Sequence, residues 1–132
     1  MSECGVCIGG NFGFEIEDYS RTITTSRRNW ACCECGRIIP AGVEYEKVTG
    51  ADEEGDSVFF RTCLDCMNIA EGLSCGERCH SRLWEDLEEC GYEDEPAFDS
   101  FSEACVAKVK TASAKAYLVE RWRIWKGLET PK

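Results

Sequence analysis

The chain has 132 residues, a formal net charge of −10 and eleven cysteines, which fits one small domain that needs an added constraint such as metal. Phosphate backbones repel so acidic a chain, so nucleic-acid binding is disfavoured as a property of the whole surface. No basic segment followed by an apolar run starts the chain, and no stretch of about 18 apolar residues occurs. We therefore expect neither a signal peptide nor a membrane span, and we expect a cytoplasmic protein with reduced thiols.

The first half of the chain predicts a short strand and then a β-hairpin. The β-branched run at residues 22–25 is typical of a strand. Residues 43–48 and 57–62 alternate as two paired strands do, and the glycine- and acid-rich residues 49–56 are typical of the turn between them. A helical pattern begins at residues 63–66.

The second half predicts helices. Ser81 can cap a helix that ends at Gly91, with an apolar face formed by Leu83, Trp84, Leu87 and Cys90. After an acidic connector, Ser100 and Glu103 match a capping box. Apolar residues then recur at spacings of three and four, which predicts one long helix ending near Gly127. These residues are Phe101, Cys105, Val109, Ala112, Ala116 and Val119. We expect a zinc-binding domain over residues 1–92, with the connector and C-terminal helix of residues 93–132 packing on it.

Two Cys-x-x-Cys pairs flank the predicted hairpin. Cys32 and Cys35 lie in a turn closed by Gly36, which can take positive φ. Cys63 and Cys66 begin a helix, whose N-terminal dipole favours thiolates. The order of knuckle, hairpin and helix is that of a treble clef, so we predict an α+β fold built on one zinc ion bound by these four sulfurs. Iron also suits four thiolates, and zinc is preferred as the commoner structural metal.

Two other interpretations of these pairs are weaker. The four cysteines could be reduced core residues, or a redox dithiol. Redox Cys-x-x-Cys motifs usually sit in a βαβ unit, and this chain lacks that alternation. Cys33 does not fit the pair spacing, so we expect it to be a small buried residue.

The remaining cysteines suggest a second zinc site. Cys4 and Cys7 form one pair, and Cys75 and Cys79 complete four ligands, although His80 could replace Cys79. The alternative is a disordered N-terminus with the other two cysteines buried. Cys90 and Cys105 lie on apolar helical faces, so we expect them in the core.

Residues 32–87, a little under half the chain, resemble small zinc-finger proteins encoded by bacteriophages, whose functions are largely unknown. The resemblance rests on Cys-Cys-Glu-Cys-Gly-Arg-Ile-Ile-Pro-Ala-Gly-Val-Glu-Tyr-Glu at 32–46, Thr-Cys-Leu-Asp-Cys at 62–66 and Leu-Trp-Glu-Asp-Leu at 83–87. It implies a phage product acting in the bacterial cytoplasm, and it implies no reaction.

An enzyme is not expected. His80 is the only histidine of the chain, and it lies inside a candidate metal cluster. Each predicted zinc site is filled by protein ligands, whereas catalytic zinc keeps an open position. No glycine-rich phosphate loop occurs, and the acidic pairs at 85–86 and 88–89 fit a solvated helix face.

A binding module fits better. Residues 71–99 carry ten acids against two bases, so a basic protein partner from phage or host is the first hypothesis. The alternative is nucleic-acid binding by the basic C-terminal helix, with bases stacking on its indoles. That interface would comprise Arg121, Trp122, Arg123, Trp125 and Lys126. The same tryptophans could instead pack on the zinc unit or join two copies in a homodimer.

Overall fold

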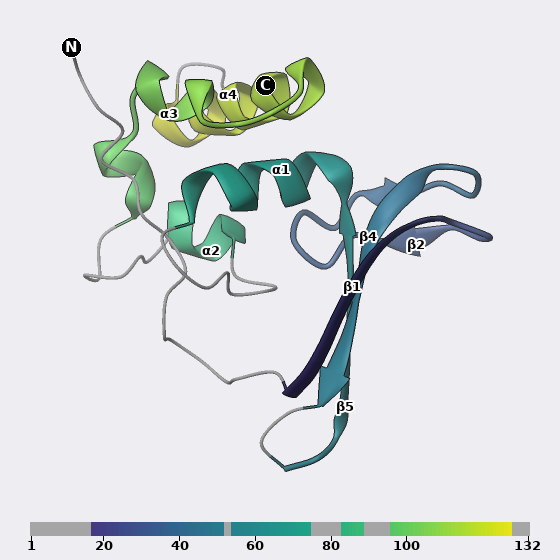
Figure 1. Cartoon of the computed structure of the whole chain (residues 1–132). Coiled ribbons are helices and arrows are strands. Elements are labelled where there is room, and N and C mark those ends of the chain that lie inside the picture. The colour runs from purple at the N-terminus through teal and green to yellow at the C-terminus, as the bar shows by residue number, and fades with distance from the viewer. Residues whose placement is uncertain (1–16, 52–53, 75–82, 89–95, 128–132) are drawn as a thin grey trace.

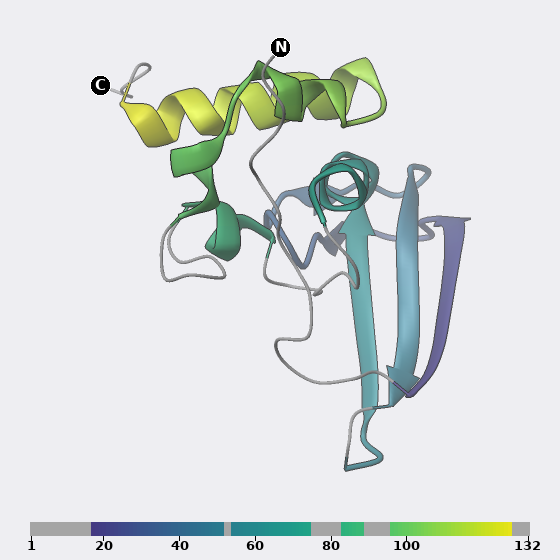
Figure 2. The ribbon, with the colours of Figure 1, turned by 60° about the vertical axis from the view of Figure 1, so that its left-hand side comes forward.

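The computed structural model describes residues 17–51, 54–74, 83–88 and 96–127, which form an α+β structure with two small antiparallel sheets (Figure 1). The helices gather around one end of the larger sheet, and the other end of that sheet projects away from them (Figures 1 and 2). The predicted cysteines at 4, 7, 75, 79 and 90, together with His80, lie outside the described residues.

The larger sheet contains the predicted hairpin. Strands β4 (Glu44–Ala51) and β5 (Ser57–Cys63) pair antiparallel, and β1 (Glu17–Thr25) adds to the free edge of β4. The hairpin is therefore confirmed, and β1 is longer than the β-branched run at 22–25 predicts. Thr22, Lys47 and Arg61 lie side by side across the three strands.

One face of this sheet packs on helix α1 (Leu64–Leu73). Arg21 reaches α1 from β1, where its Nη2 donates to Met67 Sδ at 3.0 Å and to Glu71 at 2.6 Å. The same guanidinium forms an ion pair with Glu46, which is fully buried beneath the helix. Because side chains alternate along a strand, the neighbours Thr22, Lys47 and Arg61 belong to the opposite face.

A second, two-stranded sheet forms the knuckle that carries the first cysteine pair. Strands β2 (Trp30–Ala31) and β3 (Ile38–Ile39) pair antiparallel around the turn, and the sequence analysis did not predict them. Ile39 is buried in the core, so this short sheet closes the end of the larger one.

The helical part follows α1 in the order α2 (Leu83–Glu88), the 3-10 helix η1 (Ala97–Ser100), α3 (Glu103–Ala107) and α4 (Ala112–Lys126). Leu83, Trp84 and Leu87 of α2 are buried, as predicted. Helix α1 packs on β4 and β5 on one side and on α4 on the other, and Figure 2 shows it end-on beside the sheet and beneath α4. One continuous apolar core joins the knuckle, α1 and α4.

The prediction of one long C-terminal helix was wrong. The chain leaves helical geometry between α3 and α4, where Thr111 has φ of 61° and accepts a hydrogen bond from Ala114 N. The cause is close packing on α1, because a Cβ added to Gly72 would lie 2.6 Å from the Lys108 carbonyl oxygen. Val109 is buried at this turn.

The interruption also changes which face of α4 is buried. Ala114 and Leu118 are fully buried, whereas the predicted core residues Ala112 and Ala116 are exposed. The predicted capping box is absent too, since Ser100 ends η1 and α3 begins at Glu103. The predicted end of the helix is confirmed, because Gly127 caps α4 with φ of 80°.

Candidate metal centre

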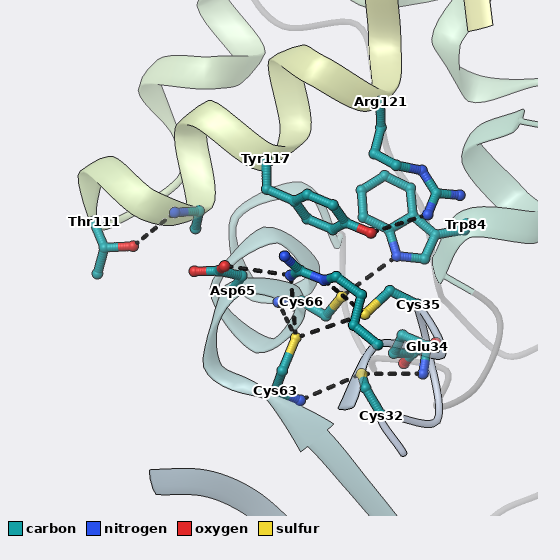
Figure 3. Close-up of polar contacts among 12 residues, drawn as sticks. Cys32, Glu34, Cys35, Cys63, Asp65, Cys66, Trp84, Thr111, Tyr117 and Arg121 are labelled. Atoms are coloured by element: carbon teal, nitrogen blue, oxygen red, sulfur yellow. Dashed lines mark hydrogen bonds and ion pairs between the residues drawn. The ribbon is translucent and has the colours of Figure 1, made fainter. Parts of the chain in front are cut away.

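Four cysteine sulfurs meet where the knuckle approaches the start of α1 (Figure 3). The Sγ atoms of Cys32, Cys35, Cys63 and Cys66 all lie within 4.8 Å of one another, and those of Cys35 and Cys63 are 3.9 Å apart. Zinc–sulfur bonds of about 2.3 Å in a tetrahedron place sulfurs about 3.8 Å apart. The four sulfurs therefore fit one tetrahedral metal ion, as the spacing of the pairs predicts.

Backbone hydrogen bonds shape the first pair. Gly36 has φ of 76° and donates its N–H to the Cys32 carbonyl at 3.0 Å, which closes the turn as predicted. Cys32 Sγ accepts from Glu34 N at 3.4 Å and from Cys63 N at 3.3 Å. These donors favour the thiolate over the thiol and bring the two pairs together.

The second pair is built into the start of α1. Cys63 is the N-cap of the helix, and its Sγ accepts from Cys66 N at 3.4 Å. The cap position therefore exposes the sulfur to the positive end of the helix dipole, which stabilises its negative charge.

Two side chains, which the sequence analysis did not single out, complete the donor set. Arg37 donates from Nε to Cys35 Sγ at 3.3 Å and from Nη2 to Cys63 Sγ at 3.7 Å. Trp84 Nε1 donates to Cys66 Sγ at 3.4 Å, and this contact is buried. Every sulfur of the cluster thus accepts at least one N–H, which suits the net charge of −2 that four thiolates and a divalent ion would carry.

These two donors connect the sulfur cluster to α4. The Arg37 guanidinium lies 3.6 Å from the ring centroid of Tyr117 and also pairs with Asp65 at 3.3 Å. The Arg121 guanidinium lies 4.2 Å from the Trp84 ring and forms an ion pair with Glu88. Figure 3 shows Tyr117, Trp84 and Arg121 lying together over the cysteines. Arg37 and Trp84 therefore link the sulfur cluster to Tyr117 and Arg121 of α4.

The shifted pKa values reflect this charge. Hydrogen bonds from Cys32, Cys63, Cys66 and Arg37 lower the pKa of Cys35, whereas hydrogen bonds with its three partners and burial raise the pKa of Cys66. Burial lowers the pKa of Arg37, but its bond to Cys35 and nearby negative charge outweigh burial and raise it. Without metal the sulfurs must share protons, and a metal ion would displace those protons.

Cys33 stands apart from the cluster. Its Sγ lies 3.3 Å from Thr62 Oγ1, and its backbone N–H donates to the Arg61 carbonyl at 2.8 Å. It is half-buried, in keeping with the small structural residue that the sequence predicts.

Cys105 belongs to the core. It is fully buried, as its place on an apolar face predicts.

The two tryptophans of the basic C-terminal segment pack inward. The Trp122 ring lies 4.7 Å from that of Phe101, and the Trp125 ring lies 5.5 Å from that of Phe98. Trp125 Nε1 also donates to the Glu88 carbonyl at 2.9 Å. The indoles therefore serve packing, which was the alternative to base stacking.

The cations of that segment have varied surroundings. Arg121 is held by Glu88 and Tyr117, Lys126 lies 4.4 Å from the Trp122 ring, and Arg123 is exposed. Of the five residues of the alternative nucleic-acid interface, the two indoles and Arg121 make contacts within the protein, and Arg123 and Lys126 are exposed.

Comparison of the chain with family models, curated proteins and solved structures finds no match. In the described ranges, no helix combines the length and apolarity that a membrane crossing requires.

Proposed function

We propose that this protein is a structural-zinc binding module, in which zinc on Cys32, Cys35, Cys63 and Cys66 fixes a treble-clef-like scaffold and the surface engages a partner. The observation that carries this proposal is the saturated donor set, because four sulfurs within 4.8 Å fill a tetrahedron. A site with four protein ligands leaves no position for a reacting water, so the metal is structural and the protein is not an enzyme at this centre.

The hydrogen bonds around the sulfurs support the same role. Backbone donors, Arg37 and Trp84 fix the orientation of each thiolate before a metal arrives, and hydrogen bonds of this kind to the ligand atoms tune metal affinity. The order of knuckle, hairpin and helix supports the treble-clef assignment.

The partner that we propose is a basic protein of a phage or its bacterial host. Its support is the acidic balance of the chain, concentrated in residues 71–99. We also propose a second zinc on Cys4, Cys7, Cys75 and Cys79, because these residues supply the four further thiolates that such a site requires.

The direct test is metal analysis of the full-length protein purified without chelators. We expect two zinc ions per chain, falling to one when Cys4 and Cys7 are replaced by Ser and to one when Cys63 and Cys66 are replaced. Cobalt substitution should give the intense visible bands of a tetrahedral thiolate site. Iron in place of zinc, or a chain without metal, would contradict the proposal.

Metal removal should also unfold the scaffold. Structural zinc contributes on the order of 10 kcal/mol of apparent binding energy near neutral pH, which is comparable with the stability of a whole domain. We expect chelation to abolish the cooperative melt of the sheet and α1, with α4 retaining part of its helicity. An unchanged melting temperature after complete metal removal would refute a structural role.

A further inference from the structure

The face of the three-stranded sheet that points away from α1 carries a continuous row of cations and aromatic rings. Lys47 and Arg61 are cross-strand neighbours, and Phe59 lies two residues before Arg61 on β5, so all three side chains share this face. Trp30 of β2 and the adjacent Arg28 extend the row. We call these five residues the cation–aromatic face.

Ring contacts hold the row together. The Arg61 guanidinium lies 3.5 Å from the Trp30 ring centroid and 4.1 Å from that of Phe59. Lys47 Nζ lies 5.4 Å from the Phe59 ring, and the Arg28 guanidinium lies 5.3 Å from the Trp30 ring. Each cation therefore contacts an aromatic face within the usual range of a cation–π interaction.

The charges of this face are not neutralised by acids. Within the described residues, Arg28, Lys47 and Arg61 have no carboxylate at ion-pair distance. Arg61 Nε, which is buried, likewise has no hydrogen-bond partner there. By contrast, Arg21, Arg37 and Arg121 each pair with an acid. Although the chain has 25 acidic residues, none in the part that the structure describes pairs with Lys47 and Arg61 on the sheet or with Arg28 beside it.

The apolar part of the face is exposed as well. Phe59 is 44% exposed, although it lies in the middle of β5. Thr22 and Ser20 extend this face onto β1, and both are exposed. The exposed part of this face is therefore an open sheet with the Phe59 ring and flanking cations, and Trp30 joins it to the core.

We propose that the cation–aromatic face binds single-stranded nucleic acid. Unpaired bases stack on aromatic rings and guanidinium planes, while cations meet the phosphates, and a β-sheet is a common platform for this arrangement. In a duplex the base faces are already stacked on one another, so they cannot stack on the aromatic rings of this face. The net negative charge of the chain repels phosphate in general, so cations without an acidic partner are favourable places for a strand to bind.

The inference is independent of the proposed protein partner and needs the zinc only as scaffold. The test is a fluorescence-anisotropy titration of a labelled 12-nucleotide oligothymidylate with the full, metal-loaded chain. Phe59→Ala and Lys47→Gln probe the face. Ile124→Ala and Lys115→Gln are the matched controls, because Ile124 on α4 is 46% exposed, much as Phe59 is.

We expect Phe59→Ala to weaken binding by about 5- to 150-fold, as removal of one stacking partner does. Lys47→Gln should weaken binding and lower the salt slope by about 0.7. With about three phosphate contacts, raising the salt from 50 to 200 mM should reduce affinity roughly 20-fold. The control variants should bind as the parent does, and thermal melting should show every variant folded.

Other outcomes overturn the inference. No binding at low salt, or equal loss in the face and control variants, would remove this face as the site. Equally tight binding of polyglutamate or of duplex DNA would show a general anion surface or an acidic protein partner. Metal analysis of the same samples distinguishes failure of the zinc proposal from failure of the nucleic-acid proposal. A metal-free chain that still binds the oligonucleotide, and binds it less well after Phe59→Ala, would refute only the zinc scaffold.

Discussion

Arg37→Gln should weaken zinc binding without altering its stoichiometry. The guanidinium donates to Cys35 at 3.3 Å and to Cys63 at 3.7 Å, so it offsets the negative charge of two ligands. A hydrogen bond to a charged group contributes about 1.5–3 kcal/mol when buried. The Arg37 side chain is 45% exposed, so solvent screening reduces this toward about 1.5–2 kcal/mol. Zinc affinity should therefore fall about 10- to 30-fold.

The assay is competition with a chromophoric zinc chelator near neutral pH. Arg37→Lys keeps the charge but not the two-nitrogen fork, so its affinity should lie between those of the parent and the glutamine variant. Arg27→Gln is the matched control, because Arg27 is exposed and has no contact with the sulfurs. Equal affinities for Arg37→Gln and Arg27→Gln would refute the idea that Arg37 stabilises the metal centre.

Three further predictions follow from individual contacts. Gly72→Ala should lower the melting temperature, because its Cβ would meet the Lys108 carbonyl oxygen at 2.6 Å and force α1 away from the turn before α4. Helix propensity alone predicts a higher melting temperature for alanine, so a raised melting temperature would disprove the close packing. Cys33→Ser should leave metal content unchanged by elemental analysis, whereas Cys35→Ser should lose one ion, and equal losses would place Cys33 among the ligands. Burial raises the pKa of Tyr117 to about 12 from an ordinary 10.0, so the folded chain holds this proton more tightly than the unfolded chain. The contribution of Tyr117 to stability should therefore be constant below about pH 10 and decline toward pH 12 in alkaline melts, and Tyr117→Phe should flatten that decline.

The parts of the structure that the sequence predicts are those specified by neighbouring residues. The spacing of the two cysteine pairs and the alternation of residues 43–48 and 57–62 are local patterns, and the clustering of the four cysteines, the hairpin and α1 are confirmed. Gly36 is also confirmed, because a tight knuckle after two ligands needs positive φ whatever surrounds it.

The parts that the sequence does not predict depend on contacts between distant residues. The apolar spacing from Phe101 to Val119 is compatible with one helix, and the break becomes visible in the structure, where Thr111 caps α4 and the Lys108 carbonyl packs on Gly72. Trp84 has the pattern of an ordinary core residue, and its bond to Cys66 becomes visible once α2 is placed. Arg37 gives no signal of its own beyond lying two residues after a ligand.

Cys63 is the N-cap of α1 and also one of the four proposed metal ligands, which has a consequence for the order of folding events. Starting a helix is the costly step, because several residues must be fixed before the first hydrogen bond forms. Closing the loop between two distant pairs is costly as well. The free energy of binding one ion to both pairs offsets the cost of loop closure and the cost of helix nucleation together, so metal binding and helix nucleation become a single kinetic step. The refolding rate of α1 should then rise with zinc concentration. It should reach a plateau when zinc binding is faster than the collapse of the unfolded chain.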